Sequence, residues 1–239
     1  CLYSKVVEKT VPVKSITVAE MTKIFENIHR AVNIGLANEM KIVADKMNIN
    51  FYEVIQAASS KPFGFTPYYP GPGIGGHCIP IDPFYLTWKA KEIGVNTRFI
   101  QLAGEINESI PDYIIEKIIY NLKKIDKSVK NSRILVLGVA YKKNVDDLRE
   151  SPALKIIDKL IKMKASVAYS DPHVPILKFK NRSNYLMKSV KLTSSSIVSF
   201  DLVLLTTDHD DFDYKFIQHE ATLIIDTRGR YEPSEKIIL

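Results

Sequence analysis

A cysteine inside a glycine-rich segment is the residue of this sequence whose type and setting best suit covalent chemistry. Cys78 stands in the run Gly-Gly-His-Cys-Ile-Pro-Ile-Asp, after Gly75 and Gly76 and four residues before Asp82. Glycines let backbone amides approach a ligand closely, and nearby donors or cations stabilise the nucleophilic thiolate. Asp82 is spaced to orient a water or act as a base. The alternative is a structural thiol, because a lone cysteine more often packs as a small apolar residue.

Three polar residues upstream of this segment share one helical face. Lys23, Asn27 and Arg30 are spaced i, i+4 and i+7, and residues at these intervals lie on the same side of a helix. Such a row of donors suits an oxyanion or a phosphate group. The alternative is the ordinary solvated stripe of an amphipathic helix.

Helical patterns surround these residues. Residues 17–60 carry apolar side chains at helical spacing, with a second, short helix expected over 51–58. Thr17 as N-cap, with Glu20 three residues on, fits a capping box. Further on, helices are expected over 84–96 and 99–125, with Pro111 near the start of the last one.

Residues 61–83 differ from their surroundings because proline and glycine are concentrated there. Five of the ten glycines fall within thirteen residues of this segment. Proline at this density excludes regular helix and central strand, while the interspersed aromatic residues argue against disorder. Long structureless loops in compact domains are usually functional or disordered. We therefore expect an ordered, functional loop.

The pattern changes again after a polar linker. Residues 133–138 read as a buried strand, and Ser151-Pro152 reads as the start of a helix. Further strands are expected over 166–170, 201–206 and 222–226. Strand and helix alternating in this way imply a parallel sheet with crossover helices. The sequence thus predicts an α/β protein with a helical domain over 17–130 and a Rossmann-like domain over 131–239.

One glycine motif matches a dinucleotide fingerprint in letters only. Residues 71–76 read Gly-Pro-Gly-Ile-Gly-Gly, but that fingerprint needs a strand before it and a helix after it, and prolines flank this one. The second domain has the strand context, yet its first strand ends with Gly138 alone. Asp171 after the next strand is either a ribose-binding acid or a turn residue. Lys142 and Lys143 lie where open α/β sheets bind ligands.

Composition excludes several classes of protein. The chain has 239 residues, 46% hydrophobic and 25% charged, with a net charge of +6, which fits a globular protein rather than a disordered one. No apolar run is long enough to span a membrane. The two cysteines suit a reducing compartment, so we expect a cytoplasmic protein. Basic residues are scattered, so neither nucleic acid nor a membrane is an expected partner. No metal site is expected.

Together, these residues carry a family resemblance. The pattern Lys23-x-x-x-Asn27, the run Gly-Pro-Gly-Ile-Gly-Gly-His-Cys-Ile-Pro-Ile-Asp-Pro and the pattern Gly-Val-Ala-Tyr-Lys-Lys…Leu-Arg-Glu-Ser resemble the UDP-glucose/GDP-mannose dehydrogenase family. Within the family, residues 61–67 and 77–80 look most like the members that oxidise UDP-N-acetylglucosamine.

The resemblance implies three domains: an NAD-binding Rossmann domain, a central helical domain that forms a homodimer, and a UDP-binding domain. We expect this sequence to supply the last two, with residues 1–16 as the tail of an absent first domain. The NAD cofactor would then have its main site outside this chain, and the chain alone would form no NADH.

The resemblance also implies roles for individual residues. The family oxidises C6 of a UDP-sugar to a carboxylate in two steps, and Cys78 would form a thiohemiacetal and then a thioester. Lys23 and Asn27 would stabilise the oxyanion, and Asp82 would assist proton transfer or orient water. Arg149 matches a position that reaches NAD. The residues implied in substrate binding are Arg30, Tyr69, Gly73, Gly75, Tyr141, Lys142 and Arg228.

Two departures from the family bear on the substrate. UDP-glucose members carry a lysine where Ile81 stands, and an arginine for which Lys61 is only a rough counterpart. Both changes favour an N-acetylhexosamine, with UDP-N-acetylglucosamine expected first. UDP-N-acetylmannosamine and UDP-glucose remain open as substrates. A further alternative is a dimerising UDP-sugar-binding module with no activity of its own.

Overall fold

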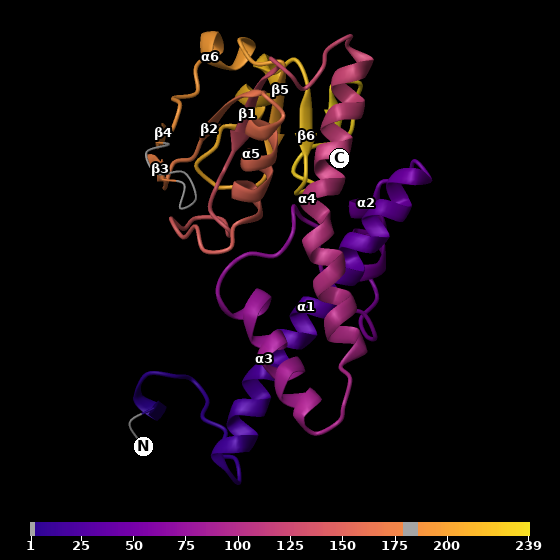
Figure 1. The fold of residues 1–239 in the computed structure, drawn as a ribbon, viewed down its shortest axis with the longest axis vertical. Coiled ribbons are helices and arrows are strands. Elements are labelled where there is room, and N and C mark those ends of the chain that lie inside the picture. Colours follow the sequence, from indigo (N-terminus) through magenta and orange to yellow (C-terminus); the bar gives the residue numbers. More distant parts are fainter. Residues whose placement is uncertain (1–2, 179–185) are drawn as a thin grey trace.

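The computed structural model describes residues 3–178 and 186–239. It consists of a helical part and a sheet part, with one long helix running alongside both (Figure 1). The first described segment, which includes a short 3-10 helix over Tyr3–Lys5, lies at the end of the helical part remote from the sheet. The α/β fold class is confirmed.

Four helices make up the helical part. They are α1 (Ile16–Lys46), α2 (Phe51–Ser59), α3 (Cys78–Glu92) and α4 (Arg98–Lys124). Helix α1 packs against both α3 and α4. The predicted N-cap at Thr17 is wrong. The cap is Ser15, whose hydroxyl accepts a hydrogen bond from the Val18 amide at 3.3 Å, so that Thr17 lies within the first turn.

Three prolines that were expected to lie outside or at the start of helices lie within them. The predicted loop over 61–83 ends early, because α3 begins at Cys78 and contains both Pro80 and Pro83. The first turn of a helix has no intrahelical partners for its amides, so Pro80 costs nothing there. Likewise, Pro111 lies inside a continuous α4 rather than near the start of a new helix.

The sheet is parallel throughout, in the order β2-β1-β5-β6-β7. The expected strands and the helix after the first of them are all present: β1 (Arg133–Leu137), α5 (Pro152–Lys162), β2 (Ser166–Ser170), β5 (Leu202–Leu205) and β6 (Ile224–Asp226). Five further elements were not predicted: β3 (Ile176–Lys178), β4 (Leu186–Lys188), α6 (Ser194–Val198), α7 (Tyr214–Glu220) and β7 (Ile237–Ile238). All five are short, so they carry little periodicity.

The main hydrophobic core joins the two parts. The second half of α4 contributes Ile114, Ile118 and Leu122 to the cluster that contains the inner residues of α5 and the sheet. Ile118 and Leu122 are completely buried. Helix α4 therefore fixes the position of the sheet relative to α1 and α3. None of the helices within the described ranges is long and apolar enough to cross a bilayer.

Candidate active site at the start of α3

Cys78 is the first residue of α3 and is half-buried. The amino terminus of a helix carries a partial positive charge, which favours an anion beside it. Asp82 follows one turn later, so the thiol and the carboxylate share one face of α3. The Asn27 Nδ2 atom on α1 donates a hydrogen bond to Asp82 Oδ2 at 2.8 Å. Residues from two helices that are far apart in the sequence thus meet one turn after Cys78.

Asn27 is oriented with one polar atom unused. Its side chain is fully buried, and its Oδ1 atom has no hydrogen-bond partner among the described residues. A buried polar atom without a partner costs free energy, so an incoming hydroxyl or water at this point is favoured. Because Nδ2 is held by Asp82, the free Oδ1 has a fixed direction.

The other two residues of the predicted row, Lys23 and Arg30, have no described contact with Asn27 or Asp82. Lys23 lies one turn before Asn27 on α1 and is exposed. Arg30 forms hydrogen bonds within its own helix, to the Glu26 carbonyl at 3.2 Å and the Glu26 carboxylate at 3.5 Å. The described contacts thus bring Asn27 and Asp82 together but do not link Arg30 to them.

A buried chain of hydrogen bonds between asparagines anchors residues 71–76, the glycine loop that leads to Cys78. The Gly71 amide donates to Asn38 Oδ1 at 2.9 Å, and Asn38 Nδ2 donates to Asn107 Oδ1 at 2.8 Å. Asn107 Nδ2 in turn donates to the Ala31 carbonyl at 3.1 Å. Sequence reasoning missed Asn38 and Asn107. The available signal was a polar residue at a position where helical spacing calls for an apolar one.

Replacing Asn38 by leucine is expected to release this loop. The Gly71 amide and Asn107 Oδ1 would each lose a buried partner, and such losses cost about 2–4 kcal/mol together. Urea unfolding followed by circular dichroism measures the change. Asn33→Leu is the matched control, because among the described residues the side chain of Asn33 bonds the His29 carbonyl of its own helix and no other group. It should cost under about 1 kcal/mol. Equal losses in the two variants would contradict an anchoring role.

The glycines of the loop are required by close packing against the sheet part. A Cβ at Gly75 would lie 2.6 Å from Tyr141 Cβ and 2.9 Å from the Glu150 carbonyl oxygen. Gly73 has a φ of +125°, and a Cβ there would lie 3.3 Å from the Asn107 carbonyl oxygen. Pro111 has no amide to bond that carbonyl, which is why the loop can approach it. The loop is thus wedged between α4 and the start of α5.

The predicted nucleotide residues gather at the carboxyl ends of the strands. Arg228 follows β6, and its Nε atom donates to the Thr206 carbonyl after β5 at 2.7 Å. Burial lowers the pKa of its guanidinium. A Cβ at Gly71 would lie 2.8 Å from one guanidinium nitrogen, so Arg228 abuts the glycine loop. Tyr141 is half-buried beside that loop, whereas Lys142 and Tyr69 are exposed.

Asp171 is a structural residue. Its Oδ2 atom accepts the Val139 and Ala140 amides at 2.7 and 3.3 Å and pairs with His209 Nε2 at 3.1 Å. Burial opposes its ionisation, but the hydrogen bonds from His209 and the amides hold its pKa below the ordinary value. The ribose-binding interpretation is therefore wrong, because the carboxylate is 3% exposed and points into the turn.

Arg149 is held in place by a neighbour. Its guanidinium forms hydrogen bonds to both carboxylate oxygens of Asp147, at 2.6–3.1 Å, and this pairing raises the pKa of Arg149 and lowers that of Asp147. Its carbonyl accepts the Gly76 amide at 2.8 Å. The backbone of Arg149 therefore ties the sheet part to the residue two positions before Cys78.

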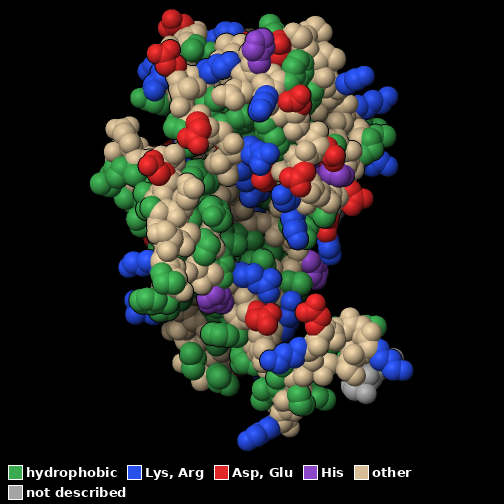
Figure 2. Space-filling view, turned by 180° about the vertical axis from the view of Figure 1, so that it is seen from behind, with side chains coloured by type: hydrophobic (Ala, Val, Ile, Leu, Met, Phe, Trp, Pro, Cys, Tyr) green, Lys and Arg blue, Asp and Glu red, His purple; other side chains and the backbone are tan. Residues whose placement is uncertain are grey.

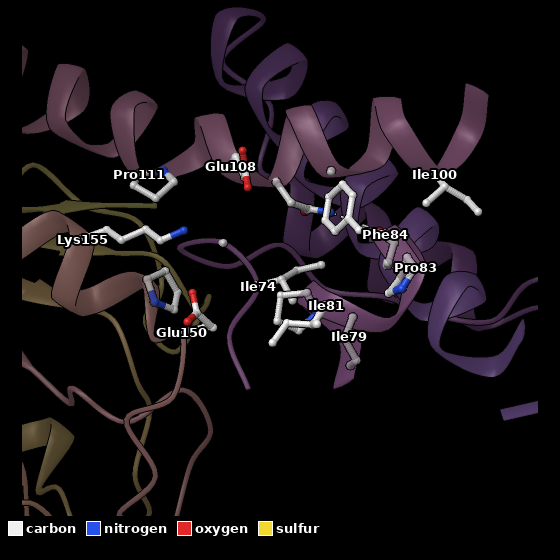
Figure 3. Close-up of a pocket in the computed structure, with 16 residues that line it drawn as sticks. Ile74, Ile79, Ile81, Pro83, Phe84, Ile100, Glu108, Pro111, Glu150 and Lys155 are labelled. Carbon is white, nitrogen blue, oxygen red and sulfur yellow. Dashed lines mark hydrogen bonds between the residues drawn. The ribbon is translucent and has the colours of Figure 1, made fainter. Parts of the chain in front are cut away.

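A small apolar cavity lies between α3, α4 and the start of α5 (Figure 3). Its volume is about 100 Å³. Ile74, Ile81 and Phe84 reach into it from the loop and α3, and Lys155 reaches in from α5. Of the predicted site residues only Gly73 lines it, but Ile79, Pro80, Ile81 and Pro83 also do. The cavity therefore adjoins the first turns of α3, which carry Cys78 and Asp82. The face of the molecule opposite to that in Figure 1 is hollowed near its middle, with Lys and Arg side chains around the hollow (Figure 2).

No cluster for a metal and no dinucleotide cradle is found within residues 3–178 and 186–239. No group of three or more His, Cys, Asp and Glu side chains is placed to hold a metal ion there. A dinucleotide pyrophosphate needs free amides where a strand runs into a helix. Glycines 71–76 follow no strand, and Asp171 already occupies the Val139 and Ala140 amides after β1. The described residues therefore do not fit NAD as its main site.

Comparison with known proteins gives two matches to family domains. Residues 17–109 match the UDP-glucose/GDP-mannose dehydrogenase family, central domain. Residues 135–233 match the UDP binding domain of the same family.

Individual relatives agree with these matches. A UDP-N-acetyl-D-mannosamine dehydrogenase of Methanococcus vannielii is 36% identical over 88% of this chain and 46% of its own length. An NDP-N-acetyl-D-galactosaminuronic acid dehydrogenase of Ralstonia nicotianae is 34% identical over 89% of this chain and 48% of its own length. The solved UDP-D-ManNAc dehydrogenase of Pyrococcus horikoshii superposes with a TM-score of 0.84 at 32% identity, over 99% of this chain and 54% of its own. The chain spans about half the length of the curated relatives it matches.

Proposed function

Because the chain belongs to the UDP-glucose/GDP-mannose dehydrogenase family of NAD-dependent nucleotide-sugar dehydrogenases, we propose that it carries the catalytic cysteine and the UDP-sugar site of such an enzyme. The reaction is the oxidation of C6 of a UDP-N-acetylhexosamine to the uronic acid in two steps. The observation that supports it best is the hydrogen bond from Asn27 to Asp82 beside Cys78 at the start of α3.

Cys78 supplies the covalent step. Its sulfur adds to C6 of the intermediate aldehyde, and the carbonyl oxygen becomes the oxyanion of a thiohemiacetal. Loss of a hydride from C6 leaves a thioester, and water then cleaves the bond between carbon and sulfur to release the carboxylate and the thiol. Covalent capture keeps the reactive aldehyde in the site between the two oxidations.

Three further residues act on charge and protons around C6. Lys23 brings a positive charge to the oxyanion. Asn27 donates to the same oxyanion through the second N–H of Nδ2, since the first is donated to Asp82. Asp82 orients the water that cleaves the thioester, or accepts a proton from it.

Other residues bind the nucleotide sugar. Arg228 and Lys142 provide positive charge for the diphosphate at the carboxyl ends of the strands, with Tyr141 beside them. The loop bearing Tyr69, Gly73 and Gly75 presents its backbone to the sugar. Arg30 contacts the substrate by family match, which requires that it exchange its bonds with Glu26.

NAD would accept the hydride that leaves C6 at each oxidation, as it does in this family. Arg149 is the residue of this chain proposed to reach it. The central helices are proposed to form a homodimer, and the domain limits of 17–130 and 131–239 remain predictions.

The substrate is proposed to be an N-acetylated hexosamine. Relatives are named for N-acetylmannosamine and N-acetylgalactosaminuronic acid, which favours an acetamido sugar over glucose. These names favour UDP-N-acetylmannosamine as the first substrate to test. The sequence-based prediction of UDP-N-acetylglucosamine stays a prediction to be tested beside it.

Thermal unfolding of the chain with each nucleotide sugar tests the binding half of this proposal. A ligand at about 100 times its Kd stabilises by about 2.7 kcal/mol, or about 5–10 °C for a chain of this size. We expect that shift with one of the two UDP-N-acetylhexosamines, a smaller one with UDP-glucose, and none with Arg228→Met. Equal shifts in wild type and Arg228→Met would contradict the proposed nucleotide site.

A binding module without activity is the second candidate, favoured by the occupied amides after β1. NADH formation, followed by absorbance with the nucleotide sugar present, separates the two. We expect none from the chain alone, and turnover when it is fused behind the NAD-binding domain of a relative. A folded fusion that binds both ligands without turnover would favour the module.

A further inference from the structure

A basic groove lies between the end of α1, the second half of α4 and β7. Its volume is about 820 Å³, and none of its described lining residues belongs to the site proposed above. Four lysines and two carboxylates line it. These are Lys41, Lys46, Lys117, Lys124, Asp45 and Glu116.

The floor of the basic groove holds more positive than negative charge. Asp45 pairs with Lys41 Nζ and, through Oδ2 at 2.7 Å, with Lys117 Nζ. The side chains of the two lysines are only 10% and 14% exposed. Tyr113 donates its hydroxyl to the same carboxylate at 2.5 Å. Among the described side chains, one carboxylate thus serves two largely buried ammonium groups. The floor therefore carries more positive than negative side-chain charge, and an unbalanced charge is costly to bury.

The floor lysines also have unused donors. An ammonium group has three N–H donors. The described contacts give Lys41 one acceptor, on Asp45, and give Lys117 two, on Asp45 and the Leu239 carbonyl. Lys117 therefore already meets an oxygen at the edge of the groove, which is the kind of atom that an anionic ligand presents.

The walls suit a flat or partly apolar ligand. Tyr113 and Tyr120 line one side, and Ile49 and Ile237 also line the groove. Lys124 lies 4.5 Å from the centre of the Tyr120 ring, a cation–π contact that holds its charge at the rim. The volume lies in the range of small-molecule sites.

We propose that the basic groove binds a small molecule with at least two phosphoryl or carboxylate groups. Lys41 and Lys117 hold one anionic group at the floor, and Lys46 and Lys124 hold another at the rim. A smaller cavity of about 30 Å³, which shares Lys41, Asp45 and Lys117, extends from here to Gly71 of the glycine loop.

Binding is expected to weaken as the pH rises through about 8. Burial, and then repulsion from Lys117, lower the pKa of Lys41 to about 8 despite Asp45. Burial opposes ionisation of Asp45, but the two lysines hold its pKa below the ordinary value, and Tyr113 has a raised pKa. The Tyr52 ring on α2 lies with its centre 6.0 Å from Lys41 Nζ, and burial raises the pKa of its hydroxyl. Glu116, Lys46 and Lys124 line the same groove. A bound anion favours protonated Lys41, so affinity is lost as that proton leaves.

Isothermal titration of the chain with pyrophosphate and with citrate at low salt tests the proposal. Lys41→Met leaves Asp45 paired with Lys117 and Tyr113, and we expect a loss of affinity of at least about tenfold together with loss of the pH dependence. Lys46→Gln/Lys124→Gln changes only exposed side chains and should weaken binding roughly fivefold. Lys215→Gln, an exposed lysine on α7, is the control and should bind as wild type does.

Comparing pyrophosphate with citrate identifies the chemical class of the ligand, and the variant Lys142→Gln tests whether the anion binds in the basic groove. Tighter pyrophosphate supports a phosphorylated ligand, and tighter citrate supports a carboxylate. No binding of either by wild type would overturn the proposal. Binding that is lost in Lys142→Gln but kept in both groove variants would also overturn it, because the anion would then sit at the nucleotide-sugar site.

Discussion

Replacing Cys78 by serine should abolish formation of the uronic acid while leaving a slow first oxidation. A serine hydroxyl cannot form the thioester from which the acid is released, so we expect acid formation to fall by at least about a thousandfold. The measurement is the yield of acid, by chromatography, from the fusion with a relative's NAD-binding domain.

The comparison variant is Cys1→Ser, which changes the other cysteine of the sequence and lies outside the described residues. It should make acid at the unaltered rate. Thermal unfolding of Cys78→Ser should match that of the parent within about 1 kcal/mol, since the change is nearly isosteric at a half-buried site. Acid released at the normal rate by Cys78→Ser would show that Cys78 is structural.

Replacing Asp226 by asparagine should cause a large loss of stability. Asp226 ends β6, is fully buried, and accepts four backbone amides within one turn. Its Oδ1 atom bonds the amides of Arg228 and Gly229 at 2.7 and 3.1 Å, and Oδ2 bonds those of Arg230 and Tyr231 at 2.6 and 2.9 Å. Burial raises the pKa of this carboxyl, and the four amides act against that rise.

An asparagine can accept at one oxygen only, and its NH₂ group faces two amides that also donate. Two buried backbone amides without acceptors lower the free energy of unfolding by about 2–4 kcal/mol. This loss lowers the Tm by roughly 5–15 °C for a chain of this size. Urea unfolding measures the first value and calorimetry the second. Asp112→Asn breaks only an exposed pair with Lys159 and should cost under about 1 kcal/mol. A loss no larger for Asp226→Asn would contradict this account of the turn.

The same variant should weaken nucleotide binding, because the turn that Asp226 holds carries Arg228. A melt with the UDP-N-acetylhexosamine separates the two effects. The ligand-induced shift should shrink in Asp226→Asn and persist in Asp112→Asn. An undiminished shift would mean that Arg228 is positioned by its bond to Thr206 alone.

Regular elements could be predicted where periodicity is strong. The strands at 133–137 and 202–205 each contain four consecutive buried aliphatic residues, which is typical of a central parallel strand. Two of the errors, the end of the predicted 61–83 loop and the start of the last central helix, came from proline. Proline lacks the amide hydrogen that a helix interior needs, but the first turn of a helix does not use it. Whether a proline breaks a helix therefore depends on where the helix begins, and the sequence did not show that α3 begins at Cys78.

The polar contacts of the site were only partly predictable. Spacing placed Asn27 and Arg30 on one face, but the partner of each depends on another element: Asp82 on α3 for Asn27, and Glu26 on the same helix for Arg30. Asp171 illustrates the same point. Its two interpretations differ only in where the carboxylate points, and the amides after β1 decide that.

Helix α4 has a consequence for how pieces of this protein can be exchanged. The two family domains match 17–109 and 135–233, so the interval between them contains Ile114, Ile118 and Leu122, which pack into the same core as the sheet and α5. A cut after that interval would separate the sheet and α5 from the α4 residues that cover them, and would leave those apolar residues exposed on the remaining helix. A cut before the interval keeps the second half of α4 with the sheet. The limits of the family domains therefore differ from the limits of the packed core. A transplanted UDP-binding domain must bring the second half of α4 with it.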